Sequence, residues 1–236
     1  MSAESIFLSL SYINWVVVTA LAVGTHAAIL LLTLRSESTR GYRGFAVFAG
    51  GGWAFLAWLA DAALPVPAAT APIHAAGDVN DALRRALLIA VASLATTWTL
   101  RIAQGADGRL VGAATVAAGV AVLVVAAMGW APTGAVAVAL LVQLLILSAV
   151  TGGAFAAMVL AHWYLVTPKL PEAPLLLLSR SLGVGIAVQL ALFVAWQLLG
   201  YGGFGSGWDF FAILRLTIGL IFPALLTYGG WRTAKG

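Results

Sequence analysis

Long apolar segments alternate with short polar gaps along the whole chain. Seven segments are long enough to count as membrane spans, at approximately residues 12–34, 44–64, 86–103, 110–128, 135–166, 176–200 and 210–231. A helix needs about 20 such residues to cross the roughly 30 Å hydrocarbon core of a bilayer. A helix also satisfies its backbone hydrogen bonds internally, and the two-residue alternation of a barrel strand is absent. The pattern therefore predicts an all-α, polytopic integral membrane protein, in which residues 1–236 form one domain of about seven transmembrane helices.

The composition agrees with this prediction and removes several kinds of chemistry. Hydrophobic residues make up 62% of the chain and charged residues 8%, whereas a soluble domain carries about 25% charged residues. The chain has no cysteine, which excludes thiolate nucleophiles, disulfides, iron–sulfur clusters and covalently attached haem. The formal net charge of +4 comes from few groups, with no basic patch interleaved with aromatics. We therefore expect the basic residues to orient the protein in a membrane and not to bind nucleic acid.

The basic residues gather in alternate gaps between the spans. One side of the predicted membrane has only Arg84 and Arg85. The other side has nine basic residues, which are Arg35, Arg40, Arg43, Arg101, Arg109, Lys169, Arg180, Arg232 and Lys235. Because basic residues concentrate in cytoplasmic loops, the count places the N-terminus outside and the C-terminus in the cytoplasm. The predicted location is the cell membrane, with the lipid bilayer as the first partner.

Two histidines are candidate metal ligands. In this orientation His26 lies in the cytoplasmic half of the first span, and His162 lies near the cytoplasmic end of the fifth. One imidazole from each of two helices can ligate the iron of a b-type haem. At 1.5 Å per residue the two histidines differ in depth by about 7 Å, which helix tilt would have to absorb.

Four residues at the same end complete the candidate cofactor site. Arg101 and Arg180 would neutralise the haem propionates, while Trp163 and Tyr164 would line the ring or a quinone head group. A structural interpretation of the same residues is also compatible with the sequence. Aromatic residues at the end of a span are typical of the interfacial belt of membrane proteins. His26 would then only donate a hydrogen bond to a neighbouring carbonyl.

A second pair of ionisable residues lies towards the external side. Asp61 is near the outer end of the second span, and Arg215 lies within the outer half of the seventh. Charges inside a span cost several kcal/mol, so they usually face a partner or a cavity. Opposite charges at similar depth predict either a structural ion pair or the polar pair of a transport path.

Glycine and proline mark special points within the spans. Glycine pairs such as Gly152-Gly153 in the fifth span allow neighbouring helices to approach closely. Pro223 is expected to kink the seventh span, because proline cannot donate a backbone hydrogen bond.

Known seven-span and haem-binding families fit this chain poorly. A retinal protein needs a lysine in its seventh span, but the two lysines are Lys169 in a loop and Lys235 in the tail. A b561-type cytochrome needs four span histidines, whereas this chain has three histidines and one of them, His74, is in a loop. No signature of a hydrolase, zinc protease or P-loop enzyme is present, so the sequence leaves open whether the chain is an enzyme.

Three functional hypotheses remain open from the sequence. The first is an electron-transfer or quinone-linked subunit, which binds haem b through His26 and His162 and works in a larger membrane complex. The second is a small transporter or channel that uses Asp61 and Arg215. The third is a non-catalytic structural subunit. Other membrane subunits or further copies of the chain are the expected protein partners.

Overall fold

The described part of the chain is helical throughout. The structure is a computed structural model, and it describes residues 3–67, 75–167, 170–200 and 209–233, which contain no strand. The predicted His74 loop position lies outside these residues. The helices are α1 (Ala3–Arg35), α2 (Arg40–Ala62), α3 (Asp78–Ala103), α4 (Arg109–Trp130), α5 (Gly134–Val166), α6 (Ala173–Leu198), α7 (Asp209–Leu216), the π-helical turn η1 (Thr217–Ile221) and α8 (Phe222–Thr233).

Seven of the helical segments are long and apolar enough to cross a membrane. Their bounds are Leu10–Arg35, Arg40–Ala62, Asp78–Ala103, Arg109–Trp130, Gly134–Val166, Ala173–Leu198 and Asp209–Arg232. The all-helical class and the seven segments predicted from the sequence are thus confirmed. The sidedness of the termini and the cell membrane stay predictions.

Local sequence signals explain several helix ends. The hydroxyls of Thr39 and Thr133 cap α2 and α5, each accepting a hydrogen bond at 3.4 Å from the backbone N–H three residues later. After α3 the chain turns at Gly105, whose φ of 74° favours glycine. α3 begins at Asp78, and its N-cap residue is Gly77, which offers no side chain for capping.

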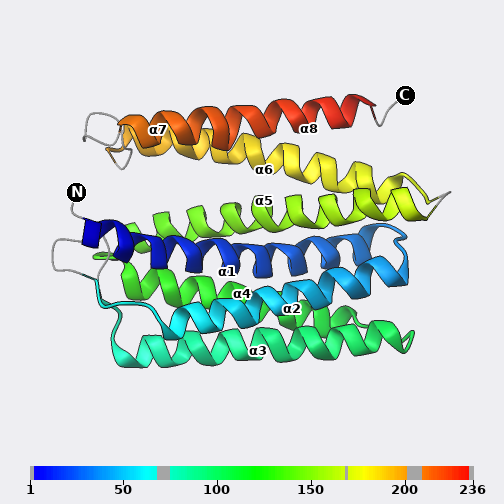
Figure 1. Cartoon of the computed structure of the whole chain (residues 1–236), viewed down its shortest axis with the longest axis horizontal. Coiled ribbons are helices and arrows are strands. Elements are labelled where there is room, and N and C mark those ends of the chain that lie inside the picture. Colours follow the sequence, from blue (N-terminus) through cyan, green and yellow to red (C-terminus); the bar gives the residue numbers. More distant parts are fainter. Residues whose placement is uncertain (1–2, 68–74, 168–169, 201–208, 234–236) are drawn as a thin grey trace.

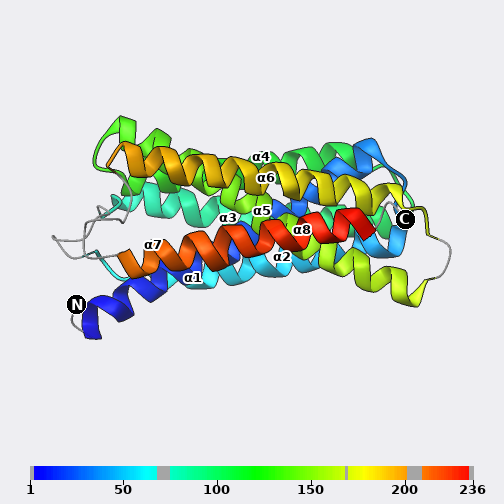
Figure 2. The ribbon, with the colours of Figure 1, turned by 90° about the horizontal axis from the view of Figure 1, so that it is seen from above.

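The helices pack in rows around α1 (Figure 1). α1 contacts α2, α4 and α5, while α3 completes this bundle by packing on α2 and α4. α6 lies against α5, and α8 lies against α6 in an outer row (Figures 1 and 2). Because the helices run up and down, the chain ends lie at opposite ends of the bundle (Figure 1). We call the end with residues 36–39, 104–108 and 170–172 the carboxy-terminal end, and the opposite end the amino-terminal end.

The closest helix contact joins α1 and α5 at two glycines. A Cβ atom on Gly24 would lie 1.7 Å from the carbonyl oxygen of Ser148. A Cβ atom on Gly152 would lie 2.2 Å from the backbone nitrogen of Thr25. The two backbones are therefore in direct contact, as small residues permit between membrane helices. The close approach predicted for the glycine pair of α5 occurs at Gly152.

The seventh span changes its helical winding just before Pro223. In η1 the backbone N–H of Phe222 donates to the carbonyl of Thr217, which is five residues earlier. Proline provides no N–H for the carbonyl four residues before it and clashes with that turn. A π-helical turn is one way in which a helix accommodates such a break. The structure therefore contains an irregular turn, η1, next to the proline that the sequence marks as a break in the seventh span.

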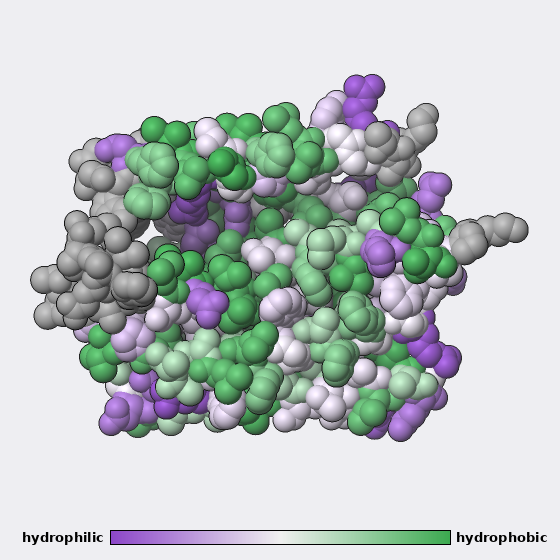
Figure 3. Space-filling model, in the orientation of Figure 1, coloured by the Kyte–Doolittle hydropathy of each residue, from purple (hydrophilic) through white to green (hydrophobic). Residues whose placement is uncertain are grey.

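The surface fits a membrane environment. Figure 3 shows apolar side chains across the middle of one face, with most hydrophilic side chains towards its two ends. Large apolar side chains such as Phe48, Met158 and Phe210 are more than half exposed. The polar groups that matter for function therefore have to be sought inside the bundle.

Candidate functional site: a buried ion network

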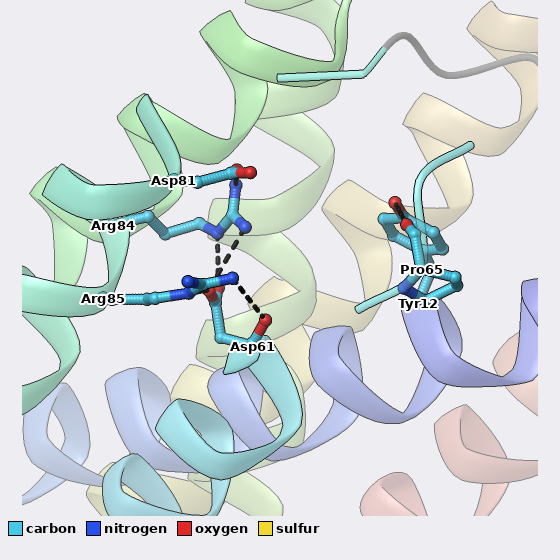
Figure 4. A network of polar contacts seen from close by, with 6 residues as sticks. All are labelled: Tyr12, Asp61, Pro65, Asp81, Arg84 and Arg85. Carbon is cyan, nitrogen blue, oxygen red and sulfur yellow. Dashed lines mark hydrogen bonds and ion pairs between the residues drawn. The ribbon is translucent and has the colours of Figure 1, made fainter. Parts of the chain in front are cut away.

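Asp61 is the centre of an ion network at the amino-terminal end of the bundle (Figure 4). It lies in the last turn of α2 and is fully buried, and Arg84 of α3 is 1% exposed. Arg84 donates from Nε to one carboxylate oxygen of Asp61 and from Nη2 to the other, the latter at 3.2 Å. Arg85 donates from Nε to the same second oxygen at 3.0 Å. Both oxygens of the carboxylate are therefore occupied by guanidinium groups.

A second carboxylate and two indole rings surround Arg84. Its Nη1 lies 2.9 Å from a carboxylate oxygen of Asp81, three residues earlier on α3. The guanidinium carbon lies 5.7 Å from the ring centre of Trp15 and 5.0 Å from that of Trp130. Aromatic faces attract a cation most strongly when water is excluded. Two carboxylates and two guanidiniums give the network a net charge of zero, so it is compensated internally.

The connection between α2 and α3 is tied to the same end of α1. The hydroxyl of Tyr12 donates to the carbonyl of Pro65 at 2.7 Å (Figure 4). The ring of Tyr12 meets that of Trp130 edge-on, at 5.4 Å between centres. These contacts hold α1, α4 and the end of α2 around the network. They place the buried charges in a fixed position between helices α1 to α4.

Arg215 is not the partner of Asp61, contrary to the predicted pair. Arg215 lies on α7, and its guanidinium carbon is 5.7 Å from the ring centre of Phe193 on α6. Both residues lie towards the amino-terminal end, as their predicted depths required. However, α2 packs on α1 and α3, whereas α7 lies in the outer row beyond α6 (Figure 1). The packing of these helices therefore does not bring Asp61 and Arg215 together.

His26 is fully buried between α1, α2 and α3 near the middle of the bundle. Its Nε2 is 3.4 Å from the carbonyl oxygen of Val47 on α2. Since a carbonyl only accepts, this contact requires the proton on Nε2. A Cβ atom on Gly50 would lie 2.7 Å from the same nitrogen, so the glycine leaves space for the imidazole. On the other side the ring centre of Trp98 is 6.2 Å away.

His162 has different surroundings from His26. It is exposed on α5, while His26 faces α2 and α3 inside the bundle. Val47 and Gly50 already occupy the space next to Nε2 of His26. The described residues contain no group of three or more His, Asp and Glu side chains placed to hold a metal. This placement gives no support to a haem iron shared by the two histidines, and that assignment stays a prediction.

The remaining candidate cofactor residues are spread over the carboxy-terminal end. Arg101 is exposed in the last turn of α3, whereas Arg180 lines an apolar cavity between α6 and α8. Trp163 packs on Gly41 of α2, where a Cβ atom would lie 2.9 Å from its ring. Tyr164 donates its hydroxyl proton to the carbonyl of Pro171. Both aromatic residues thus have structural contacts of their own.

No protein-family model, curated protein or solved structure matches this chain. The candidate site is therefore judged from its own geometry and chemistry. The best candidate site is the interior enclosed by helices α1, α2, α3 and α4. It contains the ion network at one end and His26 near its middle.

The sequence interpretation missed Arg84 and Arg85 as partners of Asp61. Both had been assigned only to the orientation of the protein. A usable signal was present, because helices that follow one another in sequence usually pack side by side. The last turn of α2 then meets the first turns of α3. A carboxylate before the connection and two arginines after it are natural partners.

Proposed function

We propose that this chain is a small membrane transporter that conducts protons through the interior between α1, α2, α3 and α4. One observation carries the proposal. The buried ionisable groups Asp61, Arg84 and His26 all belong to this interior, and each is no more than 1% exposed. Ionisable side chains are rare within membrane spans and, where they face a bundle interior, they mark ion and proton pathways.

Helical spacing supports a connected series of polar groups along α1. Trp15 and Thr19 are one turn apart, and His26 follows two turns after Thr19. All three are fully buried. At 1.5 Å per residue the backbone positions of Trp15 and His26 are about 16 Å apart along the helix. The series therefore extends from the ion network, which Trp15 contacts, to the imidazole near the middle of the bundle.

Two polar groups of this series are buried without a protein hydrogen-bond partner. The indole nitrogen of Trp15 and the hydroxyl of Thr19 are shielded from the surface and have no hydrogen-bond partner within the described residues. Buried polar atoms are normally paired, either with protein or with ordered water. The neighbouring side chains Ala22, Ala54 and Ala57 are small. Water molecules between the ion network and His26 would satisfy the unpaired donors and carry protons along the path.

The proposed roles follow from the side-chain chemistry. His26 is the proposed proton-carrying side chain: because Nε2 is bonded to the carbonyl of Val47, an arriving proton would be taken up on Nδ1. The Asp61 network places a buried carboxylate, held by two guanidiniums, at the entrance of the path. A purely structural role would need only the ion network and would give the imidazole no task beyond its contact with Val47.

Proton flux in liposomes tests this proposal. We expect purified protein to acidify vesicles loaded with a pH-sensitive dye when a potassium gradient and valinomycin set an inward driving force. His26→Gln keeps an N–H donor of similar reach but cannot carry the proton, so the flux is expected to fall at least about tenfold. Positioned proton-transfer groups in enzymes contribute roughly 100-fold to 10,000-fold. The matched control is His162→Gln, the same substitution at an exposed histidine, which should leave the flux unchanged.

Two results would contradict the proposal. One is a wild-type flux no greater than that of empty vesicles. The other is an undiminished flux in His26→Gln. Melting curves of both variants in detergent show whether a lost flux reflects lost folding.

An optical spectrum tests the electron-transfer hypothesis independently. If His26 and His162 ligate haem b, protein made with adequate haem supply will show Soret and α bands that sharpen on reduction with dithionite. Each of His26→Ala and His162→Ala should then abolish the bands. From the separate surroundings of the two imidazoles, we expect a colourless preparation.

A further inference from the structure

A cavity of about 400 Å³ lies at the carboxy-terminal end of the bundle, between the start of α2 and the connection from α3 to α4. Its wall includes three arginines, Arg40, Arg43 and Arg109. Arg40 and Arg109 are the first residues of α2 and α4. The cavity therefore lies beside the beginnings of two helices, where the aligned peptide dipoles create positive potential.

The positive charge of this cavity is not balanced by the side chains that line it. Asp107 is the carboxylate in its wall, and its oxygen lies 4.0 Å from Nε of Arg109. Three guanidiniums and one carboxylate leave a net charge of +2. The Asp61 network at the other end of the bundle has two of each and is neutral. The arginines of the Asp61 network are therefore balanced by carboxylates, whereas the arginines of the cavity carry an excess of positive charge.

Arg43 has an unused donor in this cavity. Its Nε is shielded from the surface and has no hydrogen-bond partner among the residues that the structure describes. Nη2 of Arg40 reaches the turn after α3, where a Cβ atom on Gly105 would lie 3.1 Å from it. Arg40 and Arg109 line the same cavity as Arg43. Like charges held together repel one another, and a bound anion would relieve that repulsion.

We propose that this cavity binds a phosphate-bearing anion. Guanidinium groups match the geometry of phosphate oxygens and bind them in a bidentate manner. A net charge of +2 fits a phosphate group better than a single carboxylate. The volume accommodates a phosphate ester and not only a bare ion. This site does not depend on proton conduction, because it is defined by its own side chains.

The cavity also has a physical link to the bundle interior. Trp98 forms part of its wall, and the ring centre of the same indole lies 6.2 Å from that of His26. Cβ atoms on Gly108 and Gly112 would lie 2.6 and 2.7 Å from the indole ring. The backbone of the α3–α4 connection therefore packs directly on Trp98. An anion that fixes Arg43 and Arg109 would also fix the wall next to His26.

Two sources can supply the same ligand chemistry, namely a soluble phosphate compound and the head group of an anionic lipid. Calorimetry with pyrophosphate on protein in neutral detergent tests the first source. Native mass spectrometry tests the second, by comparing retention of phosphatidic acid with that of phosphatidylcholine. The variants are Arg40→Gln and Arg43→Gln. The matched control is Arg35→Gln, which removes an exposed charge at the same end but outside the cavity.

We expect wild-type protein to bind pyrophosphate, to retain phosphatidic acid in preference to phosphatidylcholine, or both. Each cavity variant should weaken that binding about tenfold, the effect of losing one charge-assisted hydrogen bond, while Arg35→Gln leaves it unchanged. Which arm responds identifies the source. The proposal is overturned if neither ligand binds, or if Arg35→Gln weakens binding as much as the cavity variants, which would indicate general surface attraction. Because Arg40 is exposed, its variant keeps the test valid if Arg43→Gln fails to fold.

Discussion

Replacing Asp61 with alanine is expected to lower the free energy of unfolding by about 3–5 kcal/mol. The substitution leaves Arg84 buried at 1% exposure without its main counter-ion, because Asp81 alone remains to balance it. A buried charge that loses its partner keeps its desolvation penalty and loses its compensation. Thermal or denaturant unfolding in a mild detergent, followed by tryptophan fluorescence, measures the loss.

Two further variants test whether the loss of stability comes from leaving Arg84 buried without a counter-ion or merely from removing a charge. Arg85→Gln removes a cation whose side chain is 41% exposed, so it should cost less than about 1 kcal/mol. Asp61→Leu combined with Arg84→Met removes both buried charges and should be more stable than Asp61→Ala alone. If the double variant is the less stable of the two, the cost does not arise from an uncompensated Arg84.

Adding one methyl group at Gly24 or Gly152 is expected to separate α1 from α5. The new Cβ atoms would lie 1.7 Å and 2.2 Å from backbone atoms of the facing helix, and a backbone cannot move aside as a flexible side chain can. Overpacking of a close contact typically costs about 1–3 kcal/mol and sometimes more. Since α1 is the central helix, we expect Gly24→Ala and Gly152→Ala to lower the melting temperature clearly or to prevent folding.

Gly52→Ala is the matched control for both substitutions. It adds the same methyl group to a glycine in the interior of α2, but its Cβ atom would meet nothing within 4 Å. Alanine favours a helix over glycine by about 1 kcal/mol, so this variant should be neutral or more stable. Equal melting temperatures for Gly24→Ala and Gly52→Ala would show that the two backbones are not in contact.

The helical spans could be read from the sequence because their cause is local. A run of apolar residues predicts a helix whatever its neighbours are, and each of the seven predicted segments corresponds to one long helix. The third helix begins at Asp78, before the predicted start at residue 86. The ends were also largely local, as with Thr39 and Thr133. Even the break near Pro223 had a local cause, although its form as a π-helical turn did not follow from the sequence.

The candidate site was predicted only in part. The sequence indicates how deep a residue lies along its helix, but not which neighbouring helix its side chain meets. Asp61 was correctly selected as a residue that needs a partner. Its partners turned out to be Arg84 and Arg85, which the sequence interpretation had used only for orientation. The chosen partner, Arg215, has the right sign and a similar depth, but α7 lies in the outer row.

The two histidines also show that the sequence does not reveal which way a side chain faces. α1 and α5 are indeed neighbours, with backbones in contact at Gly24 and Gly152. Which way each imidazole points depends on helix rotation, and the apolar patterns of these helices are too uniform to reveal it. Rotation places His26 against Val47 in the interior and His162 on the surface.

The amino-acid sequence therefore determines the all-helical class, the number of long apolar helices, and the few polar residues that need an explanation. These follow from hydropathy and local hydrogen bonding, which act along the chain. The neighbours and rotation of each helix belong to the tertiary structure, because they depend on side-chain packing between distant segments. Packing alone brings Asp61 and Arg84 together, buries His26 beside Trp98, and gathers three arginines around one cavity.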